Sequence, residues 1–485
     1  MTNLTLCHIL CYNNNNLLKG SGNMLPTRTL ELIINTALDL GADFAEVFVE
    51  TTQNQNILMV GSRVDKLTRG DDFGIGIRLF SDTHSVYGYT TDPTEATLLQ
   101  LTRDISAALT TRHTVTPITL KASPRLTKHL ATTTLHDLTL SERIEHMRHA
   151  ATAIETYDEC ITQSKVGLLE TKQHVLIANS LGKLIEDERV RTRMSLTAIA
   201  SNGSQMQTGS HGPGAHQGFE FIEQLNIEDY AKDAARIAKT MLHANPCPSG
   251  KMPAVIDNGF GGVIFHEACG HGLEATSVAK NLSVFSNKLG KQVANPLVTA
   301  IDDGTIEHAW GSANIDDEGN PTQRNVLIEN GILKSYLIDT LNGRRMNMAP
   351  TGSSRRQSYR FAPTSRMTNT YIANGPHTLE DMISNTEYGL YAKNMGGGSV
   401  SPATGDFNFA VTEGYIIRNG KICEPVRGAT LIGNGPDILQ KIDYVGNNLA
   451  HAQGVCGSSS GQIATNVGQP ALRVSTITVG GTKED

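Results

Sequence analysis

The sequence is poor in cysteine, and its cysteines do not form the pattern of a disulfide framework. The chain has seven cysteines, an odd number, and they are scattered over its 485 residues. Secreted domains held together by disulfides carry denser, evenly numbered cysteines. We therefore expect a reducing compartment, the cytoplasm by default, in which most of these thiols are small buried apolar side chains.

Long apolar runs are missing as well. No stretch of the sequence approaches the roughly 18 to 20 apolar residues that a membrane-spanning helix needs. Residues 1–23 have a short apolar run without a basic segment before it or a small-residue cleavage site after it. We interpret residues 1–23 as a disordered extension, of the kind that an upstream start codon assigned in error produces.

An excess of positive charge is the third absence. The formal net charge is −7, which argues against DNA or RNA as principal ligands. Apolar residues make up 39% of the chain and charged residues 18%, which are proportions of a soluble globular protein. The length predicts about two to four domains.

The first half of the sequence predicts an α+β domain, residues 24–245, built as one or two units. Apolar residues at helical spacing predict a helix at 27–41. Runs rich in β-branched and aromatic residues predict strands of an antiparallel sheet at 45–52, 54–60, 73–80 and 85–91. Further helices are expected at 93–110, 140–157 with Ser141 as N-cap, and 227–243, and further strands near 161–182 and 189–202.

The second half, residues 246–485, predicts a β-rich domain. The segment NPCPSG at 245–250 is the expected boundary because it holds two prolines and a glycine. Two Asn-Gly pairs, Asn330-Gly331 and Asn419-Gly420, each lie between alternating apolar runs and predict hairpins. The remaining expectations are helices at 260–279, 378–387 and 436–443, and tight active-site loops at GGG 396–398 and GSSSG 457–461.

The segment FHEACGHGLE, residues 265–274, holds the residue types of a metal site. His266 and His271 are its histidines, Glu267 follows the first, and a glycine stands on each side of the second. A familiar zinc-protease motif has the same composition, but its histidines are four residues apart and these are five apart. Two histidines and a glutamate also fall close together by chance, so both interpretations are open at this point.

The five-residue spacing is incompatible with a regular helix. Five residues turn a helix by about 500°, which leaves the two side chains about 140° apart. A π-type widening by one residue would bring His271 back to the face of His266, and so would an end of the helix at Gly270. The glycines beside His271 favour one of these two distortions.

A catalytic zinc ion normally has three protein ligands and one open position for water. The candidates for a third ligand are Cys269, Glu274 and Cys456, the last in the flexible stretch GVCGSSSGQ. Cys269 is the poorest candidate, because a residue between two ligand histidines can hardly share an ion with both. Glu267 fits the role of a general base that takes the proton of the attacking water.

Several stretches of the sequence resemble the TldD/PmbA proteins, and specifically their TldD-type subunit. They are HEACGHGLEA, SANIDDEGNPTQRNVLIENGILKSYLIDTLNGRRM, SRMTNTYI, KNMGGGSVSPATGDFNF, VCGSSSGQ and VGQPALRVSTITVGG. The resemblance is ordered through most of 250–485 and continues more weakly through 24–245. It implies a zinc metalloprotease whose signature is HExxxH, so that a spacing of five is the rule.

Carried onto this sequence, the resemblance implies that His266, His271 and Cys456 are zinc ligands and that Glu267 is the catalytic base. Cys269 falls on an unspecified position of the signature, which supports a packing role. The resemblance also implies a dimer, with a TldE/PmbA-like subunit or with a second copy, that encloses the active site. The implied substrates are unstructured, extended peptides, which can pair with a sheet edge through their main chain.

Two other functions are compatible with the sequence. One is a non-catalytic scaffold subunit of a protease complex, although a scaffold has no need of an intact motif. The other is a redox-sensing thiol at Cys269 or Cys456, because oxidation of a zinc-bound thiolate releases the metal.

Two further sets of residues carry weaker expectations. His211 and His216 are also five residues apart, but they lie in the Gly-rich stretch 203–218, which we expect to be a solvated or substrate-flanking loop. Arg366, Asn369 and Tyr371 in SRMTNTYI are expected either to line the cavity or to lie on a sheet surface.

Overall fold

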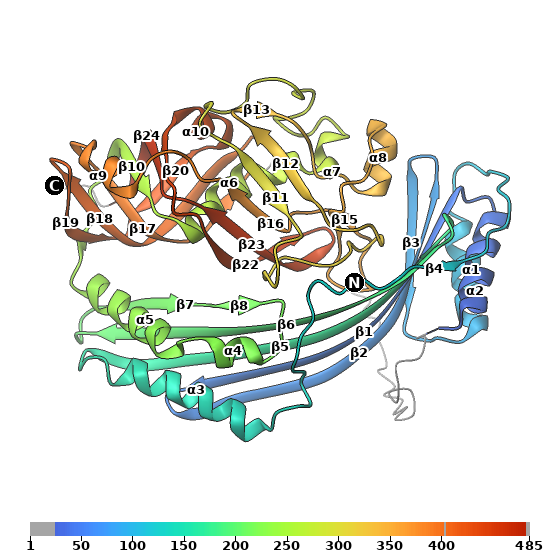
Figure 1. Cartoon of the computed structure of the whole chain (residues 1–485), viewed down its shortest axis with the longest axis horizontal. Helices are drawn as coiled ribbons and strands as arrows, with labels where there is room; N and C mark the ends of the chain where they lie inside the picture. Colours follow the sequence, from blue (N-terminus) through green and yellow to red (C-terminus); the bar gives the residue numbers. More distant parts are fainter. Residues whose placement is uncertain (1–24, 402–403, 482–485) are drawn as a thin grey trace, which may run out of the picture.

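The computed structural model describes residues 25–401 and 404–481, so the extension expected at 1–23 lies outside the described residues. The fold is α+β, with antiparallel sheets and a β-rich C-terminal part, as the sequence predicts. Among the described residues, no helix is long and apolar enough to cross a membrane. Figure 1 shows a long, curved sheet whose concave side holds the C-terminal part of the chain.

The curved sheet has the strand order β3-β2-β1-β5-β6-β4, with β7 and β8 paired to β6. Its strands are β1 Phe44–Val60, β2 Arg63–Ser81, β3 His84–Thr90, β4 Lys121–Ala122, β5 Ile161–Asn179, β6 Lys183–Ser201, β7 Met206–His211 and β8 Gly214–Ala215. Its helices are α1 Thr27–Asp39, α2 Glu95–Ser106, α3 Leu140–Glu155, α4 Glu220–Gln224 and α5 Ile227–Leu242.

Each end of the curved sheet has its own apolar core. Helices α1 and α2 cover one end, where Val47 and Val49 of β1 are buried, and α3 and α5 cover the other, where Ile57 and Met59 of the same strand are buried. The sequence predicts two strands where the structure has the single strand β1, because the polar residues between the two apolar runs continue the strand instead of ending it.

The C-terminal part contains two larger sheets and one small one. The second sheet has the order β17-β10-β24-β20-β18-β19-β9, with β21 paired to β24, and the third has the order β13-β12-β11-β16-β23-β22. The second sheet consists of β9 Asn245–Pro246, β10 Gly250–Ile256, β17 Tyr388–Val400, β18 Asp406–Arg418, β19 Lys421–Arg427, β20 Thr430–Asn434, β21 Ile442–Val445 and β24 Leu472–Gly480. The third consists of β11 Ala300–Asp303, β12 Arg324–Glu329, β13 Ile332–Leu333, β16 Asn369–Ile372, β22 Ala450–Ser458 and β23 Gly461–Gln469, and β14 Ser354–Arg355 pairs separately with β15 Thr364–Ser365.

Short helices lie between and beside these sheets. They are η1 Gly259–Gly262, α6 Val263–Ala268, η2 Gly270–Leu273, α7 Ala275–Val278, α8 Thr340–Met346, α9 Leu379–Ser384 and α10 Gly435–Lys441. Both predicted hairpins are confirmed: β12 turns into β13 at Asn330-Gly331, and β18 turns into β19 at Asn419-Gly420. All four turn residues have positive φ angles, as the favoured two-residue hairpin turn requires.

Several local expectations are wrong, and three of them concern single caps and loops. The N-cap of α3 is Thr139, which forms a reciprocal capping box with Glu142, and not Ser141. The stretch 203–218 is not simply a loop, because it contains the strands β7 and β8. The glycines at 396–398 lie inside β17 and not in a loop, where register shifts in its pairing with β18 absorb them.

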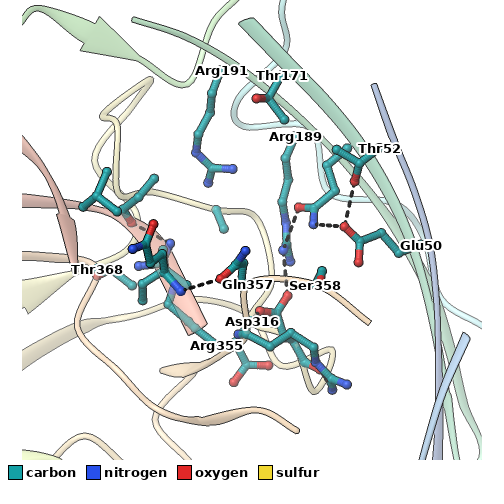
Figure 2. A pocket seen from close by; sticks show the side chains of 18 of the residues that line it. Glu50, Thr52, Thr171, Arg189, Arg191, Asp316, Arg355, Gln357, Ser358 and Thr368 are labelled. Carbon is teal, nitrogen blue, oxygen red and sulfur yellow. Dashed lines mark hydrogen bonds and ion pairs between the residues drawn. The ribbon is translucent and has the colours of Figure 1, made fainter. Parts of the chain in front are cut away.

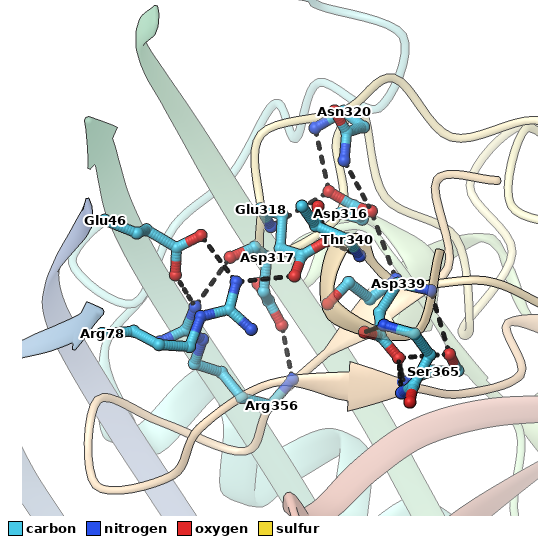
Figure 3. Close-up of polar contacts among 12 residues, drawn as sticks. Glu46, Arg78, Asp316, Asp317, Glu318, Asn320, Asp339, Thr340, Arg356 and Ser365 are labelled. Carbon is cyan, nitrogen blue, oxygen red and sulfur yellow. Dashed lines mark hydrogen bonds and ion pairs between the residues drawn. The ribbon is translucent and has the colours of Figure 1, made fainter. Parts of the chain in front are cut away.

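A buried ion-pair network fastens the C-terminal part to the curved sheet. Arg78 of β2 lies 2.9 Å from Glu46 of β1 and 2.6 Å from Glu318, and Arg356 lies 2.6 Å from the second oxygen of Glu46 (Figure 3). All four side chains are buried. Because an unpaired buried charge is costly, these contacts fix how the two parts of the chain face each other.

Candidate metal centre

The helix that carries the first histidine ends between the two histidines. Helix α6 stops at Ala268, Cys269 leaves the helical region with φ −127° and ψ −46°, and the 3₁₀ turn η2 follows. Because the helix breaks here, the side chains of His266 and His271 do not point about 140° apart, as they would in a regular helix. Of the two distortions considered from the sequence, the early end of the helix is the one present, two residues before the expected Gly270.

The glycines beside His271 serve close packing. A Cβ on Gly270 would lie 2.3 Å from the sulfur of Met367, and a Cβ on Gly272 would lie 2.9 Å from Phe285. Neither glycine has a positive φ angle. The turn is therefore pressed against its neighbours, which places His271 firmly.

The structure brings His266, His271 and Cys456 together. One nitrogen of each imidazole and the thiol sulfur all lie within 4.8 Å of one another. The sulfur of Cys456 is 3.2 Å from Nε2 of His271, although the two residues are 185 positions apart. Cys456 reaches this place because β22 is the edge strand of the third sheet, paired only with β23 among the described strands.

The second nitrogen of His271 faces a carboxylate. Nδ1 of His271 lies 3.1 Å from Oε1 of Glu274, which is itself buried. Nε of Arg366 lies 3.9 Å from the same oxygen, and Nη2 of Arg366 donates to the carbonyl of Cys456 at 2.7 Å. A carboxylate behind a ligand histidine fixes the tautomer and the orientation of the ring.

The pKa values of the two histidines are shifted in opposite directions. Burial, with the charges of His271 and Arg366, lowers the pKa of His266 well below its usual range. Burial also lowers the pKa of His271, but the charges of Glu274 and Cys456 outweigh it and hold that pKa well above its usual range. Burial raises the pKa of Glu267, whose Oε2 lies 3.6 Å from Nε2 of His271.

The donor set fits a zinc ion. Imidazole nitrogens and a cysteine thiolate are ligands that zinc takes in proteins, and three protein ligands leave the fourth position of a catalytic site open. Nδ1 of His266 is buried, and within the ranges that the structure describes it has no hydrogen-bond partner. The convergence of three metal-binding side chains within 4.8 Å is the observation that fits a bound metal ion.

Comparisons with known proteins identify the family of the whole chain. Three family models match, described as PmbA/TldA metallopeptidase domain 1 at residues 45–109, the central domain at 134–242 and the C-terminal domain at 249–481. The chain is 35% identical over 467 residues to the metalloprotease TldD homolog of Haemophilus influenzae, covering 94% of this chain and 97% of that protein. The chain belongs to the TldD/PmbA family.

More distant similarities also extend over most of the chain. A zinc metalloprotease TldD homolog of Saccharolobus solfataricus is 25% identical, with 92% of this chain and 99% of that protein covered. The crystal structure of TldE from Thermococcus kodakarensis superimposes with a TM-score of 0.74 at 16% identity, with 93% of this chain and all of that chain covered. The family resemblance expected from the sequence is confirmed.

The other predicted residues lie outside the donor cluster. Cys269 is buried in the apolar core, which raises the pKa of its thiol, and it is not among the clustered donors. His211 bonds Asp233 across 2.6 Å, and His216 is fully buried and stacked on His129. Neither belongs to a cluster of metal donors within the described ranges.

The three residues of SRMTNTYI are buried, which excludes an exposed sheet surface for them. Asn369 accepts a hydrogen bond from the amide of Gly311 and donates to Ser312, which holds that loop in place. Tyr371 packs edge-on against His451 at 5.1 Å. Arg366 ties Cys456 to Glu274, a supporting role that no short motif in the sequence indicates.

Proposed function

We propose that this protein is a zinc-dependent metallopeptidase that hydrolyses unstructured, extended peptides. The observation that supports this proposal best is the convergence of His266, His271 and Cys456 with Glu267 beside them. The zinc in the name of the Saccharolobus relative supports the choice of metal. A cytoplasmic location remains part of the proposal.

Each residue has a separate task in the proposed reaction. His266, His271 and Cys456 would hold zinc, which when bound lowers the pKa of a water molecule and polarises a carbonyl group. Glu267 is partly buried and its pKa is raised, so it accepts the proton of the attacking water and returns it to the leaving amine. Glu274 and Arg366 keep His271 and Cys456 in place.

The proposal includes a partner subunit and an extended substrate. The structural similarity to a TldE protein supports a dimer with a TldE/PmbA-like subunit, and a dimer of two identical chains is the alternative. A peptide could pair with the edge strand β22, which carries Cys456. The carbonyl groups of Gly454 and Cys456 already accept bonds from Trp310 and Arg366, so we expect only part of that edge to receive substrate.

The proposal is tested by replacing the base and leaving the metal donors. We expect Glu267→Gln to retain one zinc per chain and to lower peptidase activity at least about 100-fold, because proton transfer by a positioned group contributes 10²–10⁴-fold. Zinc is measured by elemental analysis and activity by cleavage of an unstructured peptide with a fluorescence quencher. A Glu267→Gln protein with full activity would remove this residue from the mechanism, and a wild-type protein without zinc would favour the scaffold function.

A further inference from the structure

A cavity of about 420 Å³ lies between the curved sheet and the C-terminal part. Its wall on one side is the polar middle of β1, β5 and β6, the same residues that separate the two apolar cores. On the other side it is lined by the β14 region and by the β22–β23 hairpin, including Val455. Figure 2 shows the side chains that point into it.

Most arginines of this cavity have carboxylate partners. Arg189 lies 3.0 Å from Asp187 and 2.6 Å from Asp317. Arg356 pairs with Glu46, as described above, and Arg360 lies 2.5 Å from Asp72. These three guanidinium groups are therefore neutralised within the protein.

Two arginines have no such partner. Arg191 donates from Nε to the carbonyl of Trp310 and from Nη2 to that of Ser312, and Arg355 donates to the carbonyls of Met367 and Ala464. No carboxylate of the described residues lies within ion-pair distance of either guanidinium, and no described residue accepts a hydrogen bond from Nη1 of Arg191 or Nε of Arg355. Figure 2 shows Arg191 pointing into the cavity.

Keeping Arg191 and Arg355 charged in this environment costs free energy. Burial, with the charges of Arg355 and Arg189, lowers the pKa of Arg191 to about 9. Burial outweighs the attraction of Asp317 and lowers the pKa of Arg355 to about 10. Arg355 is buried and Arg191 is half-buried. Guanidinium groups that are removed from water without an anion beside them are rare, because their desolvation is not repaid.

The two remaining carboxylates of the cavity are already occupied. Glu50 accepts bonds from Thr52, Gln173 and the amide of Tyr359. Asp316 accepts bonds from the backbone amides at 318, 320 and 354. Neither of them neutralises Arg191 or Arg355, so the free donors of the cavity are cationic.

The cavity lies on the opposite face of β22 from the metal donors. Side chains alternate along a strand, so Cys456 faces the histidines and its neighbour Val455, 56% exposed, faces the cavity. A peptide that lies along β22 would therefore present every second side chain to Arg191 and Arg355.

We propose that this cavity is a substrate subsite that binds a peptide carboxylate, an acidic side chain or the C-terminus, through Arg191 and Arg355. The subsite rests on the proposed function, since it gives the peptidase a preference for acidic extended peptides. Carboxylate oxygens match the planar N–H groups of guanidinium, and the charge-assisted bonds are stronger than neutral ones.

The test measures binding without hydrolysis, in the full-length zinc-loaded Glu267→Gln protein. Fluorescent extended peptides that differ only by Glu or Gln at successive positions, and by a free or amidated C-terminus, are titrated by fluorescence anisotropy. We expect one acidic position, or the free C-terminus, to tighten binding about tenfold, as one charge-assisted hydrogen bond does. The position that responds identifies which carboxylate is bound.

Variants of the cavity separate the subsite from the fold. Arg191→Met should remove the acidic preference and Arg191→Lys should keep part of it. Arg360 lines the same cavity, and Arg360→Gln breaks only its exposed pair with Asp72. This variant should keep the full acidic preference. Equal binding of acidic and neutral peptides overturns the proposal even if no variant folds, and so does a preference that survives Arg191→Met.

Two further outcomes have separate meanings. Acidic preference in a wild-type protein that cleaves no peptide would reject the proposed hydrolysis and leave the subsite standing. Glutarate or inorganic phosphate that stabilises the protein against heat, without any preference among the peptides, would assign the cavity to small free anions and overturn the peptide subsite.

Discussion

Glu274 acts on the metal site through His271. Its removal distinguishes a residue that orients a ligand from a residue that is itself a ligand. We expect Glu274→Gln to weaken zinc binding by about 10-fold, because loss of a carboxylate behind a ligand histidine typically costs 10–100-fold. Competition with a chelating dye measures the affinity. Peptidase activity should return at saturating zinc, and the exposed variant Glu307→Gln should bind zinc as the wild type does. Unchanged affinity in Glu274→Gln would contradict the orienting role.

Substitutions of the two cysteines near the histidines form a matched pair of tests of the third ligand. Cys456→Ser should lose most of its zinc on dialysis, because a hydroxyl is a far weaker zinc ligand than a thiolate. Cys269→Ala should retain zinc and lose about 1 kcal/mol of stability, since it removes one buried atom from an apolar core. Elemental analysis and thermal unfolding give the two readouts. Full zinc occupancy in Cys456→Ser would mean that the third ligand is another residue.

Single residues differ in how much the sequence reveals about them. His266, Glu267 and His271 lie close together in the sequence, so their chemistry can be read locally. Cys456 is 185 residues from His271, and residue types alone leave it as one of several candidates until the family resemblance selects it. Arg191 is beyond the reach of any motif, because its significance is that no carboxylate faces it, which only the packed structure shows.

At the scale of elements, the turn before α6 depends on a close backbone approach. A Cβ on Gly262 would lie 2.6 Å from backbone atoms of Gly468 in β23. We expect Gly262→Ala to lower the free energy of unfolding by about 1–3 kcal/mol, as overpacking does, and to weaken zinc binding because α6 carries His266.

The control for that substitution is a glycine in open space. A Cβ on Gly397 meets nothing within 4 Å, so Gly397→Ala should change the free energy of unfolding by no more than about 0.5 kcal/mol. Denaturant titration of both variants checks the contrast. Equal losses in the two variants would show that the contact with β23 is unimportant.

The elements that the sequence predicts least well are those set by distant packing. Helices with clear apolar spacing, such as α1 and α5, fall within a few residues of the prediction. The predicted helix at 260–279 is instead four short pieces, because the glycines allow contacts with β23 and Met367 that a continuous helix could not make. Interpreting 203–218 as a loop failed because its glycines pack against α5, where a Cβ on Gly209 would lie 2.1 Å from the carbonyl of Ala234.

For the whole molecule, a buried carboxylate links α5 to the second sheet. Glu413 of β18 is fully buried, and its carboxylate accepts hydrogen bonds from both terminal nitrogens of Arg236, at 2.7 and 3.0 Å. Burial alone would raise the pKa of Glu413, but the hydrogen bonds from Arg236 and Tyr415 outweigh it and hold the pKa below its ordinary value of 4.5. This carboxylate therefore stabilises the fold above pH 4.5, and the contribution is lost as the pH falls through the lowered pKa.

Substitution of Glu413 tests this link. We expect Glu413→Gln to lose about 3 kcal/mol at pH 7, because it breaks a buried pair, and to lose less further stability than the wild type below pH 4.5. Glu424→Gln, which breaks the exposed pair with Arg418 on the neighbouring strand, should cost less than about 1 kcal/mol. Urea unfolding from pH 3 to 7 gives the comparison, and parallel curves for wild type and Glu413→Gln would refute the role of this carboxylate.

The strand β24 lies in the middle of the second sheet, between β10 and β20, although it is the last strand described in the chain. Strand β10 leads through the turn η1 to helix α6, which carries His266, and Cys456 follows His271 by 185 residues. A ribosome that has released both histidines has therefore made neither the central strand nor the thiol. Under the proposed function, a growing chain cannot become a hydrolase until Cys456 and β24 have been synthesised. Half-made copies are thus harmless to the other nascent chains around them, which are themselves unfolded peptides.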